Sequence, residues 1–389
     1  MSIVSRLEQL QNGLTATTKS LILMSGDIPV LEFNFNIAQY DVLDELHLPW
    51  TLKGRLKRVP SFSEIKTQYE DTQRQIIMHG NYSAILGWLS SRVLPITREN
   101  AKWIYNMLGV EQIQTPENKA KFAIMCRAVS LQDNYWLQLS TESLKWSDVD
   151  VRQKHLNEVL THVALHGTAL TFTGDLNSPE ISTQGAYAKA WVREEDNLWL
   201  YKAGSKGNYE SRIEVMVSNL LDKCNVEHII YLPAKHQDLD CCKCKCMTTG
   251  QISILPGMDF ISYCLVNGLN PDDEVLRIDA ENIYKMWIVD YLISNRDRHG
   301  LNWGFFYDNS SMEILSCHPL YDHNNAFDLE WMQNPDIDYQ FGSMTIRQAA
   351  HKAISKVDFH FTENIVREDF LTDRQYKSFI TRARELSLV

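Results

Sequence analysis

The chain has 389 residues, of which 44% are apolar and 22% are charged, which is typical of a folded globular protein and not of a disordered one. Its formal net charge of −11 argues against a nonspecific nucleic-acid binder, because such proteins need a surplus of lysine and arginine to displace counterions from phosphates. The length allows two or three domains.

The sequence indicates a soluble, reducing environment. No stretch approaches the about 18 to 20 consecutive apolar residues that a membrane helix needs, and the first residues lack the charged-then-apolar pattern of a secretory signal. Eight scattered cysteines do not suggest a small disulfide scaffold. We therefore expect a cytoplasmic protein with no membrane partner and no direct contact to nucleic acid.

Residues 1 to 165 are predicted to be mostly helical. Apolar side chains recur at helical spacing over 101–108 and stop at Gly109, and a second helix is predicted over 116–131. The aromatic-rich stretch "DNYWLQLS" at 133–140 breaks the helical period, so we expect an extended or turn segment there.

From about residue 170 the pattern changes to short β-like runs. Strands are predicted at 186–192 and 198–202, joined by the polar turn "REEDN", and a helix is predicted over 210–224. The stretches "EHIIYLPA" and "GQISILPG" favour two further strands, and from residue 270 onward the sequence is helical again.

The stretch "SNRDRHGLN" at 294–302 places an unusual density of polar side chains directly before an apolar strand. "WGFFYD", "NSS" and "MEILSCHPLYDH" then follow as strand, turn and strand, so a hairpin would bring Asn302 and Asp322 close together. Both side chains offer hard oxygen ligands, which Mg²⁺ takes together with phosphate oxygens and water. The sequence therefore predicts that Asn302 and Asp322 hold Mg²⁺.

Asp297 lies five residues before Asn302 on the same short loop. A carboxylate there could orient a hydroxyl that attacks a phosphate, or accept its proton. The D-x-x-x-x-N spacing, followed one hairpin later by an aspartate, is that of a kinase catalytic loop, and we predict Asp297 as the catalytic residue.

Phosphoryl transfer also needs a cation on a rigid strand and an acid that orients it. Lys202 ends the predicted strand "LWLYK", and Glu214 lies inside the helix that follows, whereas the competing acid Glu210 comes a few residues earlier. We predict the pair Lys202 and Glu214. The stretch 173–189, "TGDLNSPEISTQGAYAK", is predicted to cover the phosphates through its backbone N–H groups.

Together, "LYKAG" with the following glutamate, "SNRDRHGLN" and "PLYDH" resemble, in this order, the HipA-like serine/threonine kinase family. The resemblance implies an α+β, bilobed protein kinase-like fold with a small β-rich lobe and a larger helical lobe, a phosphoinositide-kinase-like catalytic loop, and ATP and Mg²⁺ as cofactors. We expect a mostly helical N-terminal region at 1–165, an N-lobe at 166–255 and a C-lobe at 256–389.

The same resemblance implies regulation and partners. Members often autophosphorylate a serine in the phosphate-covering loop, for which Ser182, Ser178 and Thr183 are candidates here, with Ser182 favoured. Several members are toxins that phosphorylate aminoacyl-tRNA synthetases and are paired with an antitoxin. The expected partners are therefore a protein substrate, such as an aminoacyl-tRNA synthetase or another translation factor, and an antitoxin protein. His299 would brace the catalytic loop.

The cluster "CCKCKCM" at 241–247 has alternate cysteines, which share one face of a strand and cannot surround a tetrahedral ion alone. In a kinase-like fold this strand would lead to the segment between the lobes, and Cys246, Met247 and Thr248 are the predicted adenine contacts. Two alternatives remain: a lipid or small-molecule kinase, and a catalytically inactive nucleotide-binding interaction protein.

Overall fold

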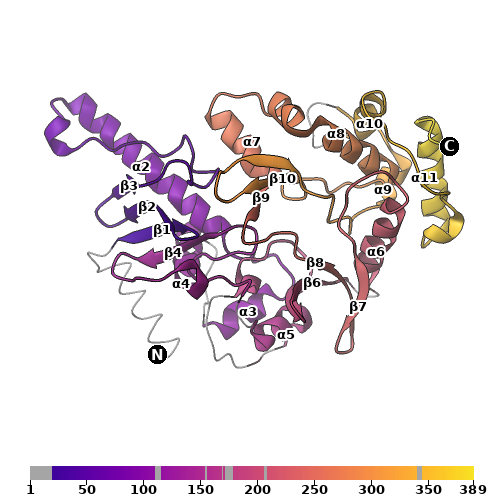
Figure 1. Ribbon diagram of the computed structural model, residues 1–389, viewed down its shortest axis with the longest axis horizontal. Coiled ribbons are helices and arrows are strands. Elements are labelled where there is room, and N and C mark those ends of the chain that lie inside the picture. Colours follow the sequence, from indigo (N-terminus) through magenta and orange to yellow (C-terminus); the bar gives the residue numbers. More distant parts are fainter. Residues whose placement is uncertain are drawn as a thin grey trace. The chain divides into compact units, whose positions relative to one another are not determined.

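The computed structural model of the chain describes residues 20–109, 115–153, 156–168, 170, 178–205, 208–339 and 344–389. These residues form two compact units (Figure 1). The first unit holds the described residues up to Leu198, with Met247–Ser253 and Asp308–Glu313. The second unit holds Trp199–Cys246, Ile254–Tyr307 and Ile314–Val389.

The first unit contains a four-stranded antiparallel sheet with the strand order β3-β2-β1-β4. Its strands are β1 (Leu21–Ser25), β2 (Ile28–Asn34), β3 (Gln39–Val42) and β4 (Tyr135–Leu139). Strands β1 and β2 are joined by a two-residue turn in which Gly26 has φ +54°, a conformation that costs glycine little and matches the twist of a hairpin.

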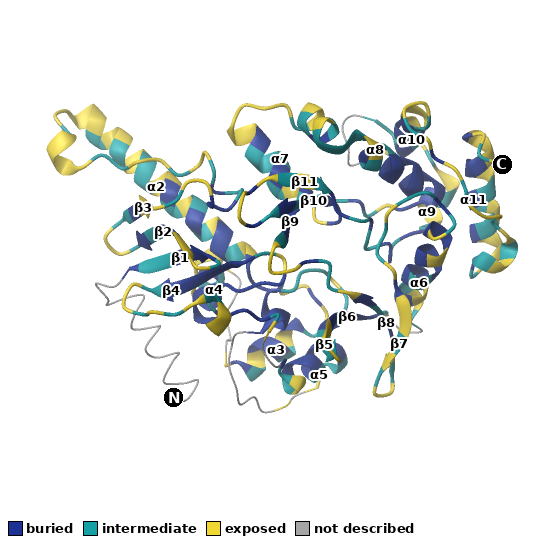
Figure 2. Cartoon of the chain, viewed as in Figure 1, coloured by how far each residue is buried: buried dark blue, intermediate teal, exposed yellow. Residues whose placement is uncertain are grey.

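The described residues of this unit also form the helices α2 (Gln68–Ser91), α3 (Ala101–Met107), α4 (Pro116–Met125) and α5 (Glu158–His166). Helix α2 begins at a capping box, since the Thr67 side chain accepts from the Glu70 backbone N–H and Glu70 accepts from the backbone N–H of Thr67. Its buried residues, Asn81, Ile85, Trp88 and Leu89, all lie in its C-terminal half, whereas its N-terminal half is largely exposed (Figure 2).

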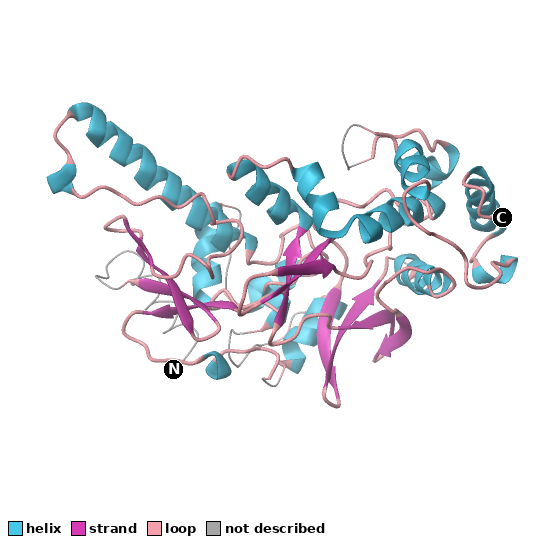
Figure 3. Cartoon of the chain, turned by 45° about the horizontal axis from the view of Figure 1, so that its top comes forward, coloured by secondary structure: helices cyan, strands magenta, loops and turns pink. Residues whose placement is uncertain are grey.

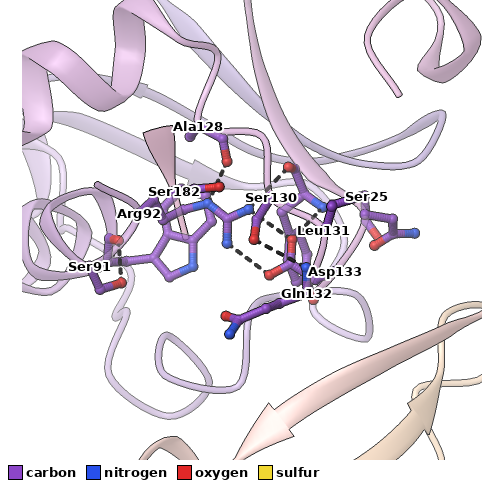
Figure 4. Close-up of polar contacts among 12 residues, drawn as sticks. Ser25, Ser91, Arg92, Ala128, Ser130, Leu131, Gln132, Asp133 and Ser182 are labelled. Atoms are coloured by element: carbon purple, nitrogen blue, oxygen red, sulfur yellow. Dashed lines mark hydrogen bonds and ion pairs between the residues drawn. The ribbon is translucent and has the colours of Figure 1, made fainter. Parts of the chain in front are cut away.

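A buried ion pair joins the end of α2 to the segment before β4 (Figure 4). Two guanidinium nitrogens of Arg92 each donate to one carboxylate oxygen of Asp133 at 2.8 Å, and a third donates to the Ala128 carbonyl at 2.5 Å. The guanidinium also stacks on Trp88 at 4.8 Å. This two-point geometry fixes the orientation of both side chains as well as their distance.

The second unit begins with β6 (Asn197–Ala203), which pairs with β8 (Leu239–Lys245), which in turn pairs with β7 (Leu232–His236), all antiparallel. Helix α6 (Tyr209–Leu221) packs against β7 and β8. Cys241, Cys242 and Cys244 of β8 are all buried, and Cys242 and Cys244 share one face of the strand, where they pack with Tyr231.

A three-stranded sheet of order β11-β10-β9 follows, built from β9 (Ile252–Pro256), β10 (Gly304–Asp308) and β11 (Ile314–Cys317). A Cβ at Gly304 would lie 2.2 Å from the Leu255 carbonyl oxygen, so only glycine lets these two strands approach. The helices of this part are α7 (Gly257–Val266), α8 (Pro271–Leu292), α9 (Leu329–Gln333), α10 (Ile346–Ile354) and α11 (Asp373–Glu385).

The α+β class predicted from the sequence is confirmed (Figure 3). The predicted strands appear as β5 (Lys189–Glu194), β6, β7 and β9, and the predicted helices as α3, α4 and α6, each with shifted ends. The segment 133–140 is strand β4. The four-stranded sheet of the first unit was not predicted. The division at residues 165 and 255 stays a prediction. In the described part of the chain, no helix has the length and apolar character needed to cross a membrane.

Candidate functional site

Lys202 lies at the end of β6 with only 4% of its surface exposed. Its position is fixed on two sides, because it pairs in register with Cys242 of β8 and its carbonyl accepts from the Ser211 hydroxyl in the first turn of α6 at 2.8 Å. A buried ammonium is costly unless carboxylates neutralise it. The Lys202 ammonium contacts two of them, Glu214 and, at 2.5 Å, Asp322.

Glu214 is completely buried on the apolar face of α6, between Ile213 and Val217. One of its carboxylate oxygens accepts from Lys202, and the other accepts from the His323 backbone N–H at 2.9 Å. The competing acid Glu210 instead accepts from the backbone and the hydroxyl of Ser205. The structure therefore brings Lys202 together with Glu214, as predicted.

The charges at this point are closely coupled. Burial by itself lowers the pKa of Lys202, but the carboxylates of Asp322 and Glu214 more than reverse this and raise that pKa well above its usual range. Burial raises the pKa of Glu214, against the opposing effect of Lys202. The lysine is therefore held in its charged form, which is the form that a phosphate would need.

Asp297 follows the end of α8 on a loop, where it makes hydrogen bonds with the side chains of three asparagines. Its backbone N–H donates to the Asn295 side chain at 3.2 Å, and its carbonyl accepts from the Asn302 side chain at 2.8 Å. Its carboxylate accepts from the Asn325 side chain, also at 2.8 Å. The predicted catalytic carboxylate is thus fixed through both its backbone and its side chain, while about a third of that side chain, 34%, remains exposed.

Arg298, the next residue, is buried at the centre of the site. Its guanidinium forms a multiple hydrogen-bonded ion pair with the Asp290 carboxylate of α8 at 3.0 to 3.2 Å. One nitrogen also donates to the carbonyls of Asn302, at 2.6 Å, and Tyr321, at 2.9 Å. Asp290 accepts in addition from the hydroxyl of Tyr339 at 2.6 Å.

This arginine brings the two predicted metal ligands together. The carbonyl of Asn302 and that of the residue before Asp322 meet at one nitrogen of Arg298, so the two ends of the β10–β11 hairpin lie side by side. Asn302 donates its amide N–H to a carbonyl, which leaves its amide oxygen as the acceptor or ligand atom.

The donor chemistry of this pair fits Mg²⁺. No group of three or more histidine, cysteine, aspartate or glutamate side chains able to hold a metal ion occurs among the described residues. A metal at the hairpin would therefore have the amide oxygen of Asn302 and the carboxylate of Asp322 as protein ligands, completed by phosphate and water. Mg²⁺ in proteins commonly has only one or two protein ligands, with phosphate oxygens and water as the others.

The tetrapeptide Asp322–Asn325 connects all parts of the site. Asp322 contacts Lys202, and its backbone N–H donates to the Tyr231 hydroxyl at 3.3 Å. The His323 ring lies 3.2 Å from the Arg298 guanidinium, and Asn325 reaches Asp297. Asp322 has φ +59°, which is strained for a residue other than glycine, and such backbone strain is often found at functional sites.

The predicted adenine contacts lie where the chain passes from the first segment of the second unit back to the first unit. Cys246 is the last residue of that segment, while Met247 and Thr248 belong to the first unit. The Thr248 hydroxyl donates to the Leu131 carbonyl and accepts from Arg152 at 3.1 Å. The role of these residues in adenine binding stays a prediction.

The candidate phosphorylation sites lie in the first unit, and residues 173–177 of the predicted phosphate-covering loop lie outside the described part. Ser178 and Ser182 are buried, and their hydroxyls donate to Glu180 and to the Pro179 carbonyl. Thr183 donates to the same carbonyl at 2.6 Å. Figure 4 includes Ser182 in the polar surroundings of Arg92. In this conformation all three hydroxyls are engaged within the unit.

The other predicted residues have structural surroundings. His299 accepts from the Leu301 backbone N–H at 3.2 Å, and its role in bracing the loop stays a prediction. Cys242 and Cys244 pack with Tyr231 in a small apolar cluster, and burial raises the pKa of the Cys244 thiol to about 12, so it stays a neutral apolar group.

Sequence reasoning missed four residues of this site: Asp290, Arg298, Asn325 and Tyr339. Asp290 left a signal, because it is the single acid in the apolar helical stretch "MWIVDYL" and a buried carboxylate must have a partner. Asn325 left none, since its contact with Asp297 depends on the path of the chain after β11.

The sequence matches no protein-family model, and no curated protein is significantly similar to it. Solved structures are similar. The proinflammatory kinase CtkA of Helicobacter pylori is 14% identical, over 52% of this chain and 90% of that one, with a TM-score of 0.34. The toxin–antitoxin structure of HipA, HipB and operator DNA from Shewanella oneidensis MR-1 matches with 12% identity, over 95% of this chain and 98% of that one, with a TM-score of 0.48.

Proposed function

We propose that the chain is a kinase that transfers the γ-phosphoryl group of ATP, with Mg²⁺, to a serine or threonine hydroxyl of a protein. The observation that supports this most is the position of Lys202. A single buried ammonium contacts a helix glutamate, Glu214, and an aspartate that follows the hairpin, Asp322. Strand lysine, helix glutamate and post-hairpin aspartate are the parts that phosphoryl transfer requires around the phosphates.

In this proposal each residue has one task. Lys202, kept charged and oriented by Glu214, binds the phosphates. Asn302 and Asp322 hold Mg²⁺, which neutralises charge on the phosphate oxygens. Asp297 orients the acceptor hydroxyl and takes its proton as the new phosphate ester forms, and ADP leaves with the former bridging oxygen.

The test is phosphate transfer itself. The protein is incubated with γ-labelled ATP, Mg²⁺ and a cell lysate, and the label is separated into protein-bound and solvent-extractable fractions. We expect protein-bound label with the wild type and a loss of about 10² to 10⁴-fold with Asp297→Asn. Label in the extractable fraction would indicate a lipid or small-molecule kinase instead. ATP binding without any transfer, including to the chain itself, would indicate an inactive nucleotide-binding protein.

The biological setting follows from the sequence resemblance alone. Aminoacyl-tRNA synthetases or other translation factors as substrates, autophosphorylation at Ser182, Ser178 or Thr183, a toxin role and an antitoxin partner all stay predictions. Phosphoproteomics after parallel expression of the wild type and Asp297→Asn would identify the substrate, because only phosphosites that need Asp297 would differ between the two samples.

A further inference from the structure

We propose that Asn325 is a positioning residue for Asp297, with its amide fixing one carboxylate oxygen so that the other is directed toward the acceptor hydroxyl. This inference rests on the proposed function and adds to it a residue that no motif contains. The contact behind it is the hydrogen bond from the Asn325 Nδ2 to the Asp297 Oδ2 at 2.8 Å.

The backbone of Asp297 is already fixed without Asn325. Asn295 accepts from its N–H, and Asn302 donates to its carbonyl. What these two contacts leave free is rotation of the partly exposed side chain, whose Oδ1 faces the His299 ring across 3.8 Å, too far for a hydrogen bond. Since Asn325 donates to one of the carboxylate oxygens, it removes this remaining freedom.

Asn325 is itself held on a rigid turn. The Ala326 backbone N–H donates to the His323 carbonyl at 2.9 Å, which closes a four-residue turn with Asn325 in its third position. The next N–H, of Phe327, donates to the Ile293 carbonyl at the end of α8 at 2.7 Å. Ala326 and Phe327 are both buried, so the turn is anchored in the core directly beside the amide that reaches Asp297.

An amide suits this task because it is neutral. A lysine or arginine in its place would pair with the Asp297 carboxylate and oppose its protonation, whereas an aspartate would repel it. An amide N–H orients the carboxylate and leaves its second oxygen able to accept a proton.

The neighbouring Asn324 provides a matched control. It has the same side chain and is one residue away in the same turn, but it is buried and its side-chain oxygen has no hydrogen-bond partner among the residues that the structure describes. Asn325→Ala and Asn324→Ala therefore remove the same group from adjacent positions, and only the first removes a contact to Asp297.

The experiment measures initial rates of label transfer from γ-labelled ATP to the lysate protein fraction. For Asn325→Ala we expect the maximal rate to fall about 10 to 100-fold, because a misplaced reacting group costs this much. The ATP concentration that half-saturates the rate should change by less than about 2-fold, because the ATP-binding residues are untouched. For Asn324→Ala, the maximal rate and this ATP concentration should both stay within about 2-fold of the wild type. Thermal unfolding confirms that each variant is folded.

Asn325→Asp adds a readout that a purely structural role would not change. Its new carboxylate would lie against the Asp297 Oδ2, and two carboxylates at hydrogen-bond distance must share a proton. In a plot of transfer rate against pH, the fall of the rate on the acidic side should therefore occur at higher pH than in the wild type. If Asn325→Ala does not fold, this nearly isosteric variant carries the test.

Five outcomes are decisive. A reduced maximal rate in Asn325→Ala alone, with the shifted profile, supports the inference. Three results overturn it: a wild-type maximal rate in Asn325→Ala, an equal loss of maximal rate in Asn324→Ala, or an effect of Asn325→Ala on the half-saturating ATP concentration alone. If the wild type transfers label and Asp297→Asn does not, any of these three results overturns the positioning role of Asn325 and leaves the proposed kinase function standing. If the wild type transfers no label, the proposed function fails and the inference fails with it.

Discussion

The ammonium of Lys202 contacts the carboxylates of both Glu214 and Asp322, so one buried cation neutralises two acids from separate parts of the chain. Glu214 comes from α6, twelve positions after the lysine, and Asp322 from beyond β11, 120 positions after it. Any loss of the cation leaves two acids without compensation. The site therefore also holds α6 and the segment after β11 together, and its residues affect stability as well as function.

Removing that cation should destabilise the fold. We expect Lys202→Met to lower the free energy of unfolding by about 3 to 5 kcal/mol, the usual cost of breaking a buried ion pair from one side. Urea unfolding measures this. Lys235→Met is the matched control, because Lys235 lies on β7 in an ion pair with Asp240 in which both side chains are more than 60% exposed. Such a pair contributes about 0 to 1 kcal/mol. Equal losses in the two variants would contradict this role of Lys202.

His318 should make stability fall at acidic pH. Burial lowers its pKa to about 4, although the Pro319 carbonyl opposes this, and its ring packs against Phe306 and Tyr321. A histidine whose pKa is depressed in the fold stabilises it above the unfolded pKa, about 6.5, and this stabilisation is lost as the pH falls toward the folded value. Between pH 7 and pH 4.5 the loss is about 2 to 3 kcal/mol.

His318→Phe tests this. Phenylalanine keeps an aromatic ring in the same packing but cannot bind a proton. We expect its free energy of unfolding to depend less on pH than that of the wild type over this interval, by about 2 to 3 kcal/mol. His360→Phe serves as the control, because the His360 side chain is 52% exposed. An unchanged pH dependence in His318→Phe would show that His318 is not the group responsible.

Breaking the Arg298–Asp290 pair should cost more than removing both charges. Both side chains are fully buried, so Arg298→Met leaves the Asp290 carboxylate with only its neutral hydrogen-bond donors, and we expect a loss of about 3 to 5 kcal/mol. Adding Asp290→Leu should recover part of it, since no unpaired charge remains. Urea unfolding of the four proteins of this cycle gives the coupling energy. A double variant less stable than Arg298→Met would contradict the expectation.

The parts of the site that could be predicted from the sequence are those that depend on a single helix, strand or hairpin. Lys202 at a strand end, Glu214 inside the next helix and the return of Asp322 beside Asn302 each follow from a helix, a strand or a hairpin. Arg298 and Asn325 could not be found in this way. Their partners are set by how α8, the hairpin and the following turn pack together, and polar side chains leave no periodic signal of such packing.

The fold shows the same division. Helices α3, α4 and α6 have regular apolar spacing and were predicted. The first unit's four-stranded sheet was missed in part because β4 lies 110 positions after its neighbour β1, counted from Ser25 to Tyr135 (135 − 25), and pairing across that distance has no local signal. Its first strands are short, and short apolar runs do not distinguish a strand from a buried helix segment.

Asp322 and Asp297 should differ in their effects on nucleotide binding. We expect Asp322→Asn to raise the Mg²⁺ concentration that half-saturates binding of a fluorescent ATP analogue by about 10-fold or more, because it replaces a charged hard ligand with a neutral one. Asp297→Asn should leave binding within about 2-fold while abolishing transfer, since Asp297 acts on the hydroxyl and not on the metal. Asp328→Asn is the control, because Asp328 is an acid six residues further on that caps α9. With EDTA in place of Mg²⁺, the wild type and Asp322→Asn should bind the analogue equally weakly. A wild-type Mg²⁺ response in Asp322→Asn would remove Asp322 from the metal site and leave the ion pair with Lys202 as its role in the site.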